Sequence, residues 1–307
     1  MRIVFMGNSE FSIPVLQKII ESKHHLLAVV SNPPKKMGRG NLYKYTPIGD
    51  FSRKNDLHLI HPDQLDSNLF QDKIRALKPD LFIVVAYKIL PISLINIPNY
   101  GALNLHASLL PKYRGAAPIQ WALMNGEKTT GITIFQIKPD VDTGDILYQK
   151  EYTINENDNM YSLGMRLCVS GSKYVVKTID EIHKGKIIAV PQDSNKATSA
   201  PKITKKMATI NWSWSAQKIH NWVRGLSPFP GMVTKYKNKN LRIFKTKLYP
   251  GLATNIGEIY LINKKELIIS TGNGLLSLLE VQLEGKKRMD IQNFLNGNLL
   301  VQGERLI

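Results

Sequence analysis

The sequence has a single cysteine, Cys168, in 307 residues. One cysteine cannot form an internal disulfide bond, so no such bond stabilises this chain. Cys168 lies in a segment with helical spacing, residues 160–184, among Leu163, Leu167 and Val175. Because free cysteines commonly pack as small apolar residues, we expect a buried, unreactive thiol and not a nucleophile.

Long apolar runs are also missing. No run reaches the roughly 18 apolar residues of a membrane-spanning helix. A membrane partner would also fit a cytoplasmic enzyme less well, so we expect none. Residues 1–7 have the pattern of a buried strand followed by a turn. They lack the apolar region of a secretory signal and the Arg- and Ser-rich composition of a transit peptide, so we expect a cytoplasmic protein.

Acidic residues are scarce: the chain has 24 Asp and Glu against 41 Lys and Arg, a formal net charge of +17. The imbalance is strongest over residues 194–257, which contain 12 Lys or Arg and no acid. A solvated surface normally mixes both signs, so this segment favours a polyanionic partner, with nucleic acid as the first candidate. A proteome that is merely rich in lysine is the alternative explanation.

The first half of the chain alternates predicted strands and helices, which indicates a Rossmann-like open α/β sheet. The strand predicted over residues 81–86 is almost wholly apolar, as a parallel strand buried on both faces would be. Two nucleotide-binding signatures are absent, however: no Gly-x-Gly-x-x-Gly follows the first strand, and no Walker sequence occurs. A nicotinamide or ATP role therefore has no support.

The length of the chain makes two domains a better expectation than one core. A polar stretch with two prolines, residues 191–207, predicts a linker between a catalytic domain over 1–190 and a second domain over 208–307. The second domain has a helical pattern over 210–226, followed by five short strands between 232 and 282. These strands indicate a small OB-like β-barrel, a fold that often binds oligonucleotides or RNA.

Residues that could bind a metal show no convincing spacing. The single cysteine and the scattered histidines do not fit the usual ligand patterns. Asp140, Asp142 and Asp145 resemble a calcium loop only in part, because the glycine stands at the fifth place, Gly144, instead of the sixth. Strands and not helices flank this segment, so we expect no metal.

Asn104 and His106, followed 36 residues later by Asp142, are the candidate catalytic residues. Side chains two apart on a strand share a face, so Asn104 and His106 project together while Leu103 and Leu105 face the packing side. An amide, an imidazole and a carboxylate at the carboxyl end of a strand suit a reaction in which negative charge develops on an oxygen. The alternative is a strand-end Asn and His that only make hydrogen bonds in the turn.

These residues belong to a longer pattern that resembles a known family. Asn-x-His-x-Ser-Leu-Leu-Pro-x-x-Arg-Gly-x-x-Pro over 104–118, followed by Asp-x-Gly-Asp over 142–145, is similar to the formyltransferases that use 10-formyltetrahydrofolate. The basic loop over 32–54 and the second domain resemble, within this family, the members that act on methionyl-tRNA. Further matches extend the resemblance over essentially the whole chain, at residues 6–11, 38–40 and 210–231.

The resemblance implies an enzyme that passes a formyl group from 10-formyltetrahydrofolate to the α-amino group of methionine on initiator tRNA, for translation initiation. In that chemistry Asn104 donates a hydrogen bond to the oxyanion. His106, protonated or sharing a proton with Asp142, stabilises the oxyanion too. Asp142 holds the imidazole and relays a proton through water from the amine toward N10. No metal is implied, and a monomer is expected.

The resemblance also implies which residues bind the folate, in an apolar slot with a few directed polar groups. The 138–144 loop would close one side of the slot. Core packing is an alternative role for Ile89 and Leu90. The segment along the folate is Ser108, Leu109, Leu110 and Pro111, and the residues near its pterin are Tyr87, Lys88, Ile89 and Leu90.

For tRNA, the resemblance implies contacts by basic residues in both domains. Arg39 is the candidate for reading an unpaired or weakly paired first base pair of the acceptor end. A disordered basic surface is the alternative for the loop that carries it. The implied tRNA-binding residues are Lys35, Lys36, Arg39, Lys205 and Lys206.

Three other functions compete with this one. Another folate-dependent formyltransferase or hydrolase, acting on an amino sugar, a ribonucleotide amine or water, would keep Asn104, His106 and Asp142 but would not need a basic second domain. A non-catalytic RNA-binding protein on an inactive folate fold would not need these three residues intact. An oxidoreductase would depend on the Rossmann-like pattern alone.

Overall fold

The computed structural model describes residues 1–37, 42–297 and 300–307. The chain forms two compact units, each built from more than one stretch of sequence. In the part that is described, no helix combines the length and the apolar character needed to cross a membrane. The N-terminal unit comprises Met1–Gly115, Thr130–Thr153 and Gly164–Ser199, and the C-terminal unit comprises Ala116–Thr129, Ile154–Leu163 and Ala200–Ile307.

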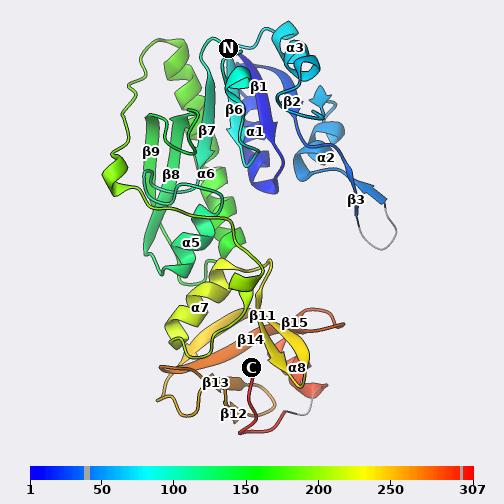
Figure 1. Cartoon of the computed structure of the whole chain (residues 1–307), viewed down its shortest axis with the longest axis vertical. Coiled ribbons are helices and arrows are strands. Elements are labelled where there is room, and N and C mark those ends of the chain that lie inside the picture. The colour runs from blue at the N-terminus through cyan, green and yellow to red at the C-terminus, as the bar shows by residue number, and fades with distance from the viewer. Residues whose placement is uncertain (38–41, 298–299) are drawn as a thin grey trace. The chain divides into compact units, whose positions relative to one another are not determined.

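The N-terminal unit contains a seven-stranded open sheet (Figure 1). Its strands, in their order across the sheet, are β5 (Leu59–Ile60), β2 (His25–Val30), β1 (Arg2–Gly7), β6 (Leu81–Val85), β7 (Ala102–His106), β8 (Thr129–Gln136) and β9 (Ile146–Thr153). The strands from β5 to β7 are parallel, and β8 is antiparallel to β7. All residues of β6 are apolar and buried, as expected for a central strand covered on both faces.

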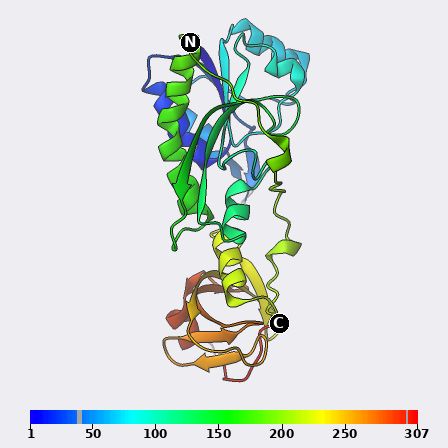
Figure 2. The same cartoon turned by 90° about the vertical axis from the view of Figure 1, so that its left-hand side faces the viewer.

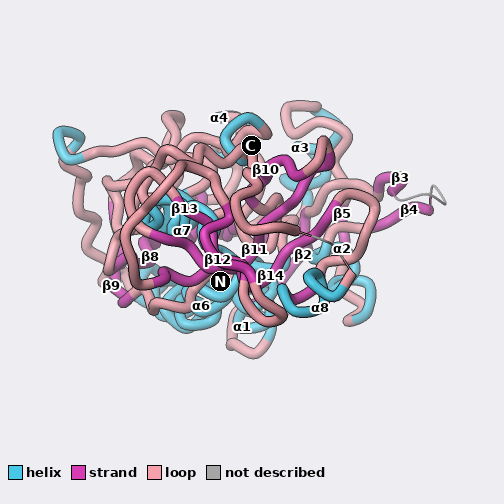
Figure 3. Tube along the Cα trace, turned by 90° about the horizontal axis from the view of Figure 1, so that it is seen from below, coloured by secondary structure: helices cyan, strands magenta, loops and turns pink. Residues whose placement is uncertain are grey.

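Helices and short turns surround this sheet. The segment over 32–54, predicted as a loop, is more ordered than expected: it includes a two-stranded hairpin that projects from its unit (Figure 1, Figure 3). A helix follows because the Thr46 hydroxyl accepts the backbone N–H of Gly49 and Pro47 occupies the first turn. The elements are η1 (Glu10–Ser12), α1 (Ile13–Ile20), β3 (Lys35–Met37), β4 (Leu42–Lys44), α2 (Pro47–Lys54), α3 (Asn68–Ala76), α4 (Ile92–Ile95), α6 (Met160–His183) and η2 (Ser194–Lys196).

The long helix α6 covers one face of the sheet (Figure 2). Gly171 permits the close approach, because a Cβ atom there would lie 3.2 Å from Leu105 and 3.3 Å from Ile132. Cys168 of the same helix is buried, as expected, and burial raises the pKa of its thiol to about 12. The thiol therefore stays protonated at neutral pH and is a poor nucleophile.

The C-terminal unit contains an antiparallel sheet (Figure 2). Residues of its strands and of its helices together form the hydrophobic core. Its strands, in order, are β10 (Met232–Tyr236), β11 (Lys239–Tyr249), β14 (Leu275–Leu283), β13 (Leu267–Ser270) and β12 (Ile259–Ile262), and β15 (Met289–Asp290) pairs with β14. The helices are α5 (Pro118–Met124), α7 (Ala216–Gly225) and α8 (Ile291–Asn296), with the turn η3 (Lys206–Ala208). An open α/β sheet followed by a separate antiparallel β unit is the combination that the sequence predicted.

The segment 303–307 closes the sheet of the C-terminal unit into a barrel. On one side, Lys235 of β10 exchanges two backbone hydrogen bonds with Ile307, at 2.6 and 3.0 Å. On the other side, the N–H of Ile259 in β12 donates to the carbonyl of Glu304 at 2.8 Å. Both edge strands are thus paired, which removes the exposed edges that an open sheet would present.

His220 on α7 gives the C-terminal unit a defined pH dependence. Its Nδ1 lies 2.9 Å from the Thr246 hydroxyl of β11. Burial, reinforced by the charge of Arg224, lowers the pKa of this histidine from 6.5 to about 4. Between those two values the unfolded chain takes up a proton that the folded chain does not, so stability is complete above about pH 6.5 and is lost as the pH falls toward 4.

We therefore expect His220→Gln to weaken the pH dependence of stability. The thermal unfolding midpoint should fall between pH 7 and pH 5 in the parent protein, and it should fall less in the variant. His25→Gln, which changes an exposed histidine of the N-terminal unit, is the matched control. An unchanged pH dependence in His220→Gln would contradict the assignment.

Candidate active site

Asn104 and His106 lie at the carboxyl end of β7. They alternate with Leu103 and Leu105, which are buried, and Leu105 is the residue that meets α6. Because neighbouring residues of a strand point to opposite faces, the amide and the imidazole lie on the face away from α6. Asn104 is partly exposed, and its side chain makes no hydrogen bond to any described residue. Its amide is therefore available to a substrate.

The imidazole of His106 is buried and fixed in orientation. Its Nε2 lies 2.9 Å from the backbone carbonyl of Tyr113, and the ring packs edge-on against Phe135 with centroids 6.4 Å apart. A carbonyl oxygen can only accept, so Nε2 carries the proton of this hydrogen bond. Proton exchange is thus left to Nδ1, which lies 3.7 Å from Oδ2 of Asp142.

The carboxylate of Asp142 is held in place by main-chain groups. Its Oδ2 accepts the backbone N–H of Gly115 at 2.7 Å. Asp142 itself has a φ of 54°, in the left-handed region that non-glycine residues occupy at a cost. Gly144, two residues later, packs so closely on β8 that a Cβ atom would lie 1.5 Å from the carbonyl oxygen of Gln136. The loop therefore has little freedom to place the carboxylate elsewhere.

Gln192 completes the support of this loop. Its Nε2 donates to the backbone carbonyls of Asp142, at 2.9 Å, and of Gly144, at 2.7 Å. Its Oε1 accepts two hydrogen bonds from the Arg114 guanidinium, at 3.1 and 2.8 Å. Gln192 stands in the predicted linker and was not predicted to be functional, because a lone glutamine there carries no spacing signal.

The segment 108–111, which is predicted to lie along the folate, is tied to the sheet by side chains of β8 and β9. The Thr133 hydroxyl donates to the carbonyl of Ser108 at 2.7 Å and accepts the N–H of Leu110 at 3.1 Å. The Gln149 amide donates to the carbonyl of Leu110 at 2.8 Å. Ser108 and Leu110 are buried, Leu109 and Pro111 are partly exposed, and the Leu110–Pro111 peptide bond is cis.

The segment 87–90, which is predicted to lie near the pterin, follows the carboxyl end of β6, the strand that pairs with β7. Leu90 is 5% exposed and belongs to the core of the unit, whereas Ile89 is 74% exposed and Lys88 is also exposed. The Tyr87 hydroxyl is buried without a hydrogen-bond partner among the described residues, and burial raises its pKa. A buried hydroxyl without a partner is unfavourable, so this position fits a polar group of a ligand.

Comparison with known proteins identifies the family. A formyl transferase model matches residues 1–179, and a formyl transferase C-terminal domain model matches residues 202–299. The chain is 39% identical over 305 residues to the methionyl-tRNA formyltransferase of Caldanaerobacter subterraneus, with 99% of each chain covered. It is 43% identical over 302 residues to the methionyl-tRNA formyltransferase of Thermodesulfovibrio yellowstonii, with 98% of this chain and 97% of that one covered. This chain belongs to the methionyl-tRNA formyltransferase family.

A solved structure with low sequence identity shares the fold of this chain. HypX from Aquifex aeolicus, in complex with tetrahydrofolic acid, superimposes with a TM-score of 0.68 at 18% identity. The alignment covers 96% of this chain and 47% of HypX. The predicted family, the formyl-transfer activity and the two-part fold are thereby confirmed.

The basic residues predicted to bind tRNA are distributed over both units of the formyltransferase. Lys35 and Lys36 are exposed on β3, and the Lys36 ammonium lies 5.6 Å from the centre of the Tyr43 ring. Lys205 and Lys206 are exposed at η3 in the C-terminal unit. Arg39 lies outside the described residues. No cluster of metal-ligating side chains occurs in the described ranges.

The Gln192 contacts predict a loss of formyl transfer when they are removed. We expect Gln192→Ala to lower kcat by about 10- to 100-fold, because a small displacement of the Asp142 loop misplaces the carboxylate. Gln192→Glu keeps an acceptor for Arg114 but faces the two loop carbonyls with a carboxylate, so it should be at least as harmful. Gln282→Ala, at the outer surface of the C-terminal unit, is the control. Normal kcat in Gln192→Glu would rule out the contact to the loop carbonyls.

Proposed function

We propose that this chain transfers the formyl group of 10-formyltetrahydrofolate to the α-amino group of methionine on charged initiator tRNA, for translation initiation. The observation that carries the proposal is the His106–Asp142 pair beside the accessible amide of Asn104, in a member of the methionyl-tRNA formyltransferase family. We propose further that the enzyme acts as a monomer in the cytoplasm. For its domains we retain the limits 1–190 and 208–307, with a linker over 191–207.

The acceptor amine needs little activation. An unperturbed α-amino group has a pKa of about 7.7–8.0, so a useful fraction is neutral at cytoplasmic pH. The difficult step is the addition of this amine to the formyl carbon, which places negative charge on the formyl oxygen. The Asn104 amide donates to that oxygen, and the imidazolium of His106 stabilises the charge from the same face of β7.

Proton transfer in this proposal involves only Nδ1 of the His106 imidazole, the nitrogen that faces Asp142. The Nε2 proton of His106 is committed to the Tyr113 carbonyl at 2.9 Å, so only Nδ1 can gain or lose a proton. Asp142 stabilises the protonated ring at Nδ1 and relays a proton through water from the attacking amine toward N10 of the folate. Collapse of the intermediate then releases tetrahydrofolate and the formylated amine.

The folate itself would lie between the two segments that follow β6 and β7. Ser108 to Pro111 are pinned by Thr133 and Gln149, so this side of the slot is rigid. The buried Tyr87 hydroxyl and the exposed Ile89 provide one polar and one apolar contact for a flat heterocycle. The tetrahydrofolic acid complex of HypX, which shares this fold, supports the assignment of a folate.

Affinity for tRNA would come from phosphate contacts. The acid-free segment over 194–257, with Lys205 and Lys206, supplies positive charge in the C-terminal unit. Lys35 and Lys36 supply it on β3, and Arg39 adds a further positive charge nearby in the sequence. Such contacts release counterions, so binding should weaken steeply with salt.

An assay in which charged initiator tRNA competes with amino-sugar and ribonucleotide amines separates this acceptor from the others, because a preference for a small amine would overturn the proposal.

The catalytic assignment predicts large losses of turnover. Asn104→Ala and His106→Ala should each lower kcat by about 10²–10³-fold or more, the usual effect of losing one oxyanion donor. Single-turnover formylation of charged initiator tRNA measures the effect directly. Circular dichroism and the thermal midpoint check that each variant is folded. Near-normal transfer by either variant refutes its assignment.

Arg39 offers a test of tRNA discrimination. If it reads the first base pair of the acceptor end, Arg39→Ala should reduce the preference for initiator over elongator methionyl-tRNA. The measurement is kcat/KM for both charged tRNAs, with Lys286→Ala as a control at an exposed lysine of the C-terminal unit. An equal loss for both tRNAs would mean that Arg39 contacts only phosphate.

A further inference from the structure

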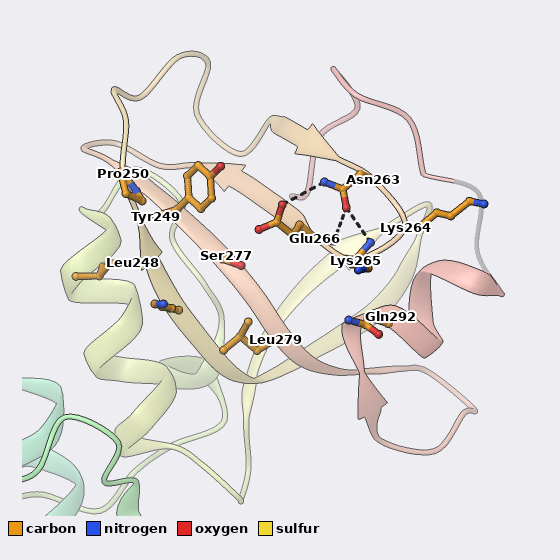
Figure 4. A pocket seen from close by; sticks show the side chains of 11 residues that line it. Leu248, Tyr249, Pro250, Asn263, Lys264, Lys265, Glu266, Ser277, Leu279 and Gln292 are labelled. Carbon is orange, nitrogen blue, oxygen red and sulfur yellow. Dashed lines mark hydrogen bonds between the residues drawn. The ribbon is translucent and has the colours of Figure 1, made fainter.

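The barrel of the C-terminal unit carries a hollow of about 850 Å³ on its outer surface (Figure 4). Residues of β11 and β14 form its floor, the turn between β12 and β13 forms one rim, and Gln292 of α8 contributes to another. All of these residues belong to one compact unit. The catalytic residues belong to the other unit, so this hollow is no part of the site that contains Asn104 and His106.

Positive charge is in excess in this hollow. Lys247, Lys264 and Lys265 line it, and none of the three ammonium groups forms an ion pair with a described residue. Glu266 is the carboxylate of the lining, and it accepts a hydrogen bond from the Asn263 amide at 3.1 Å. A concave surface with this balance of charge attracts anions, phosphate groups among them.

The hydroxyl of a largely buried serine opens into the same hollow. Ser277 is 7% exposed, and it pairs with Lys247 across β11 and β14. Its hydroxyl makes no hydrogen bond to another described residue and is accessible from the hollow. Figure 4 shows Ser277 on the floor, with Tyr249 on one side of the hollow and Lys264 and Lys265 on the other. A polar group in this position has an unused hydrogen-bonding capacity that a ligand can satisfy.

An aromatic ring lies beside these groups. Tyr249 is two residues from Lys247 on β11, so the ring and the ammonium share the outer face of the barrel. The ring is partly exposed. Proteins bind unpaired nucleotides with three kinds of group. Cations bind the phosphate, an aromatic ring stacks on the base, and a hydroxyl bonds to the base edge or the ribose.

We propose that this hollow binds one unstacked nucleotide of the tRNA substrate. The base stacks on Tyr249, the adjoining phosphate meets Lys247 and the two lysines of the β12–β13 turn, and the Ser277 hydroxyl bonds to the base or ribose. The inference rests on the proposed function, because it takes the RNA to be tRNA. An acidic peptide would use the lysines without the ring, so the role of Tyr249 separates these partners.

Binding of a fluorescent single-stranded RNA hexamer to the full chain, followed by anisotropy, tests the inference. Tyr249→Ala should weaken binding by about 5- to 100-fold, whereas Tyr249→Phe should bind nearly as the parent does, because the ring remains. Lys247→Gln should reduce the slope of log affinity against log salt by about 0.7. Lys287→Gln, at an exposed lysine outside the hollow, should change the affinity little.

Three results would overturn the inference. One is equal hexamer binding by Tyr249→Ala and the parent, with both folded by thermal melting. Another is binding of AMP as tight as binding of the hexamer, which would indicate a site for free nucleotides. The third is an unchanged KM for charged tRNA in Tyr249→Ala, since the inference expects a higher KM with kcat retained. Absence of formyl transfer by the parent protein would instead overturn the proposed function, and the hexamer measurement would still stand.

Discussion

The geometry of the active site depends on hydrogen bonds that fix the position of one carboxylate. Asp142 lies in a loop, where a carboxylate would normally turn toward water. The Gly115 N–H holds its Oδ2, and the Gln192 amide holds the main chain on both sides of its neighbour Thr143. With these contacts in place, Oδ2 of Asp142 lies 3.7 Å from Nδ1 of His106. The reactive pair is therefore a product of backbone placement more than of its own mutual attraction.

The two compact units divide the physical work of the enzyme between them. The N-terminal unit presents a few buried polar groups on a rigid sheet edge, where water is scarce and each dipole acts strongly. The C-terminal unit presents exposed lysines, where single contacts with a polyanion would be weak and, under the proposed function, their number would determine affinity. Under the proposed function, precise chemistry and extended electrostatic attraction would come from surfaces with opposite requirements for solvent.

Periodicity in the sequence located most of the regular elements but few of the contacts that support the site. The apolar run at 81–86 predicted β6, because a strand buried on both faces has apolar residues throughout. The alternation around Asn104 predicted β7, because successive side chains of a strand face opposite sides. Residue types made His106 and Asp142 candidates, and the family pattern implied that Asp142 holds the imidazole. Gln192 and the Thr133 hydroxyl could not be found, since they act through backbone atoms, which any sequence contains. The helix within 32–54 was hidden by its basic composition.

The packing of Gly144 allows the loop that carries Asp142 to move away from the sheet but not toward it. With no room for even one carbon atom between this residue and the Gln136 carbonyl, the loop cannot move inward against the sheet. Any widening of the site as large substrates enter must carry the loop outward, and the Gln192 hydrogen bonds resist that direction. Steric contact thus limits the loop on the side of the sheet, and hydrogen bonds limit it on the outer side. In the position between these limits, the Asp142 carboxylate faces the imidazole.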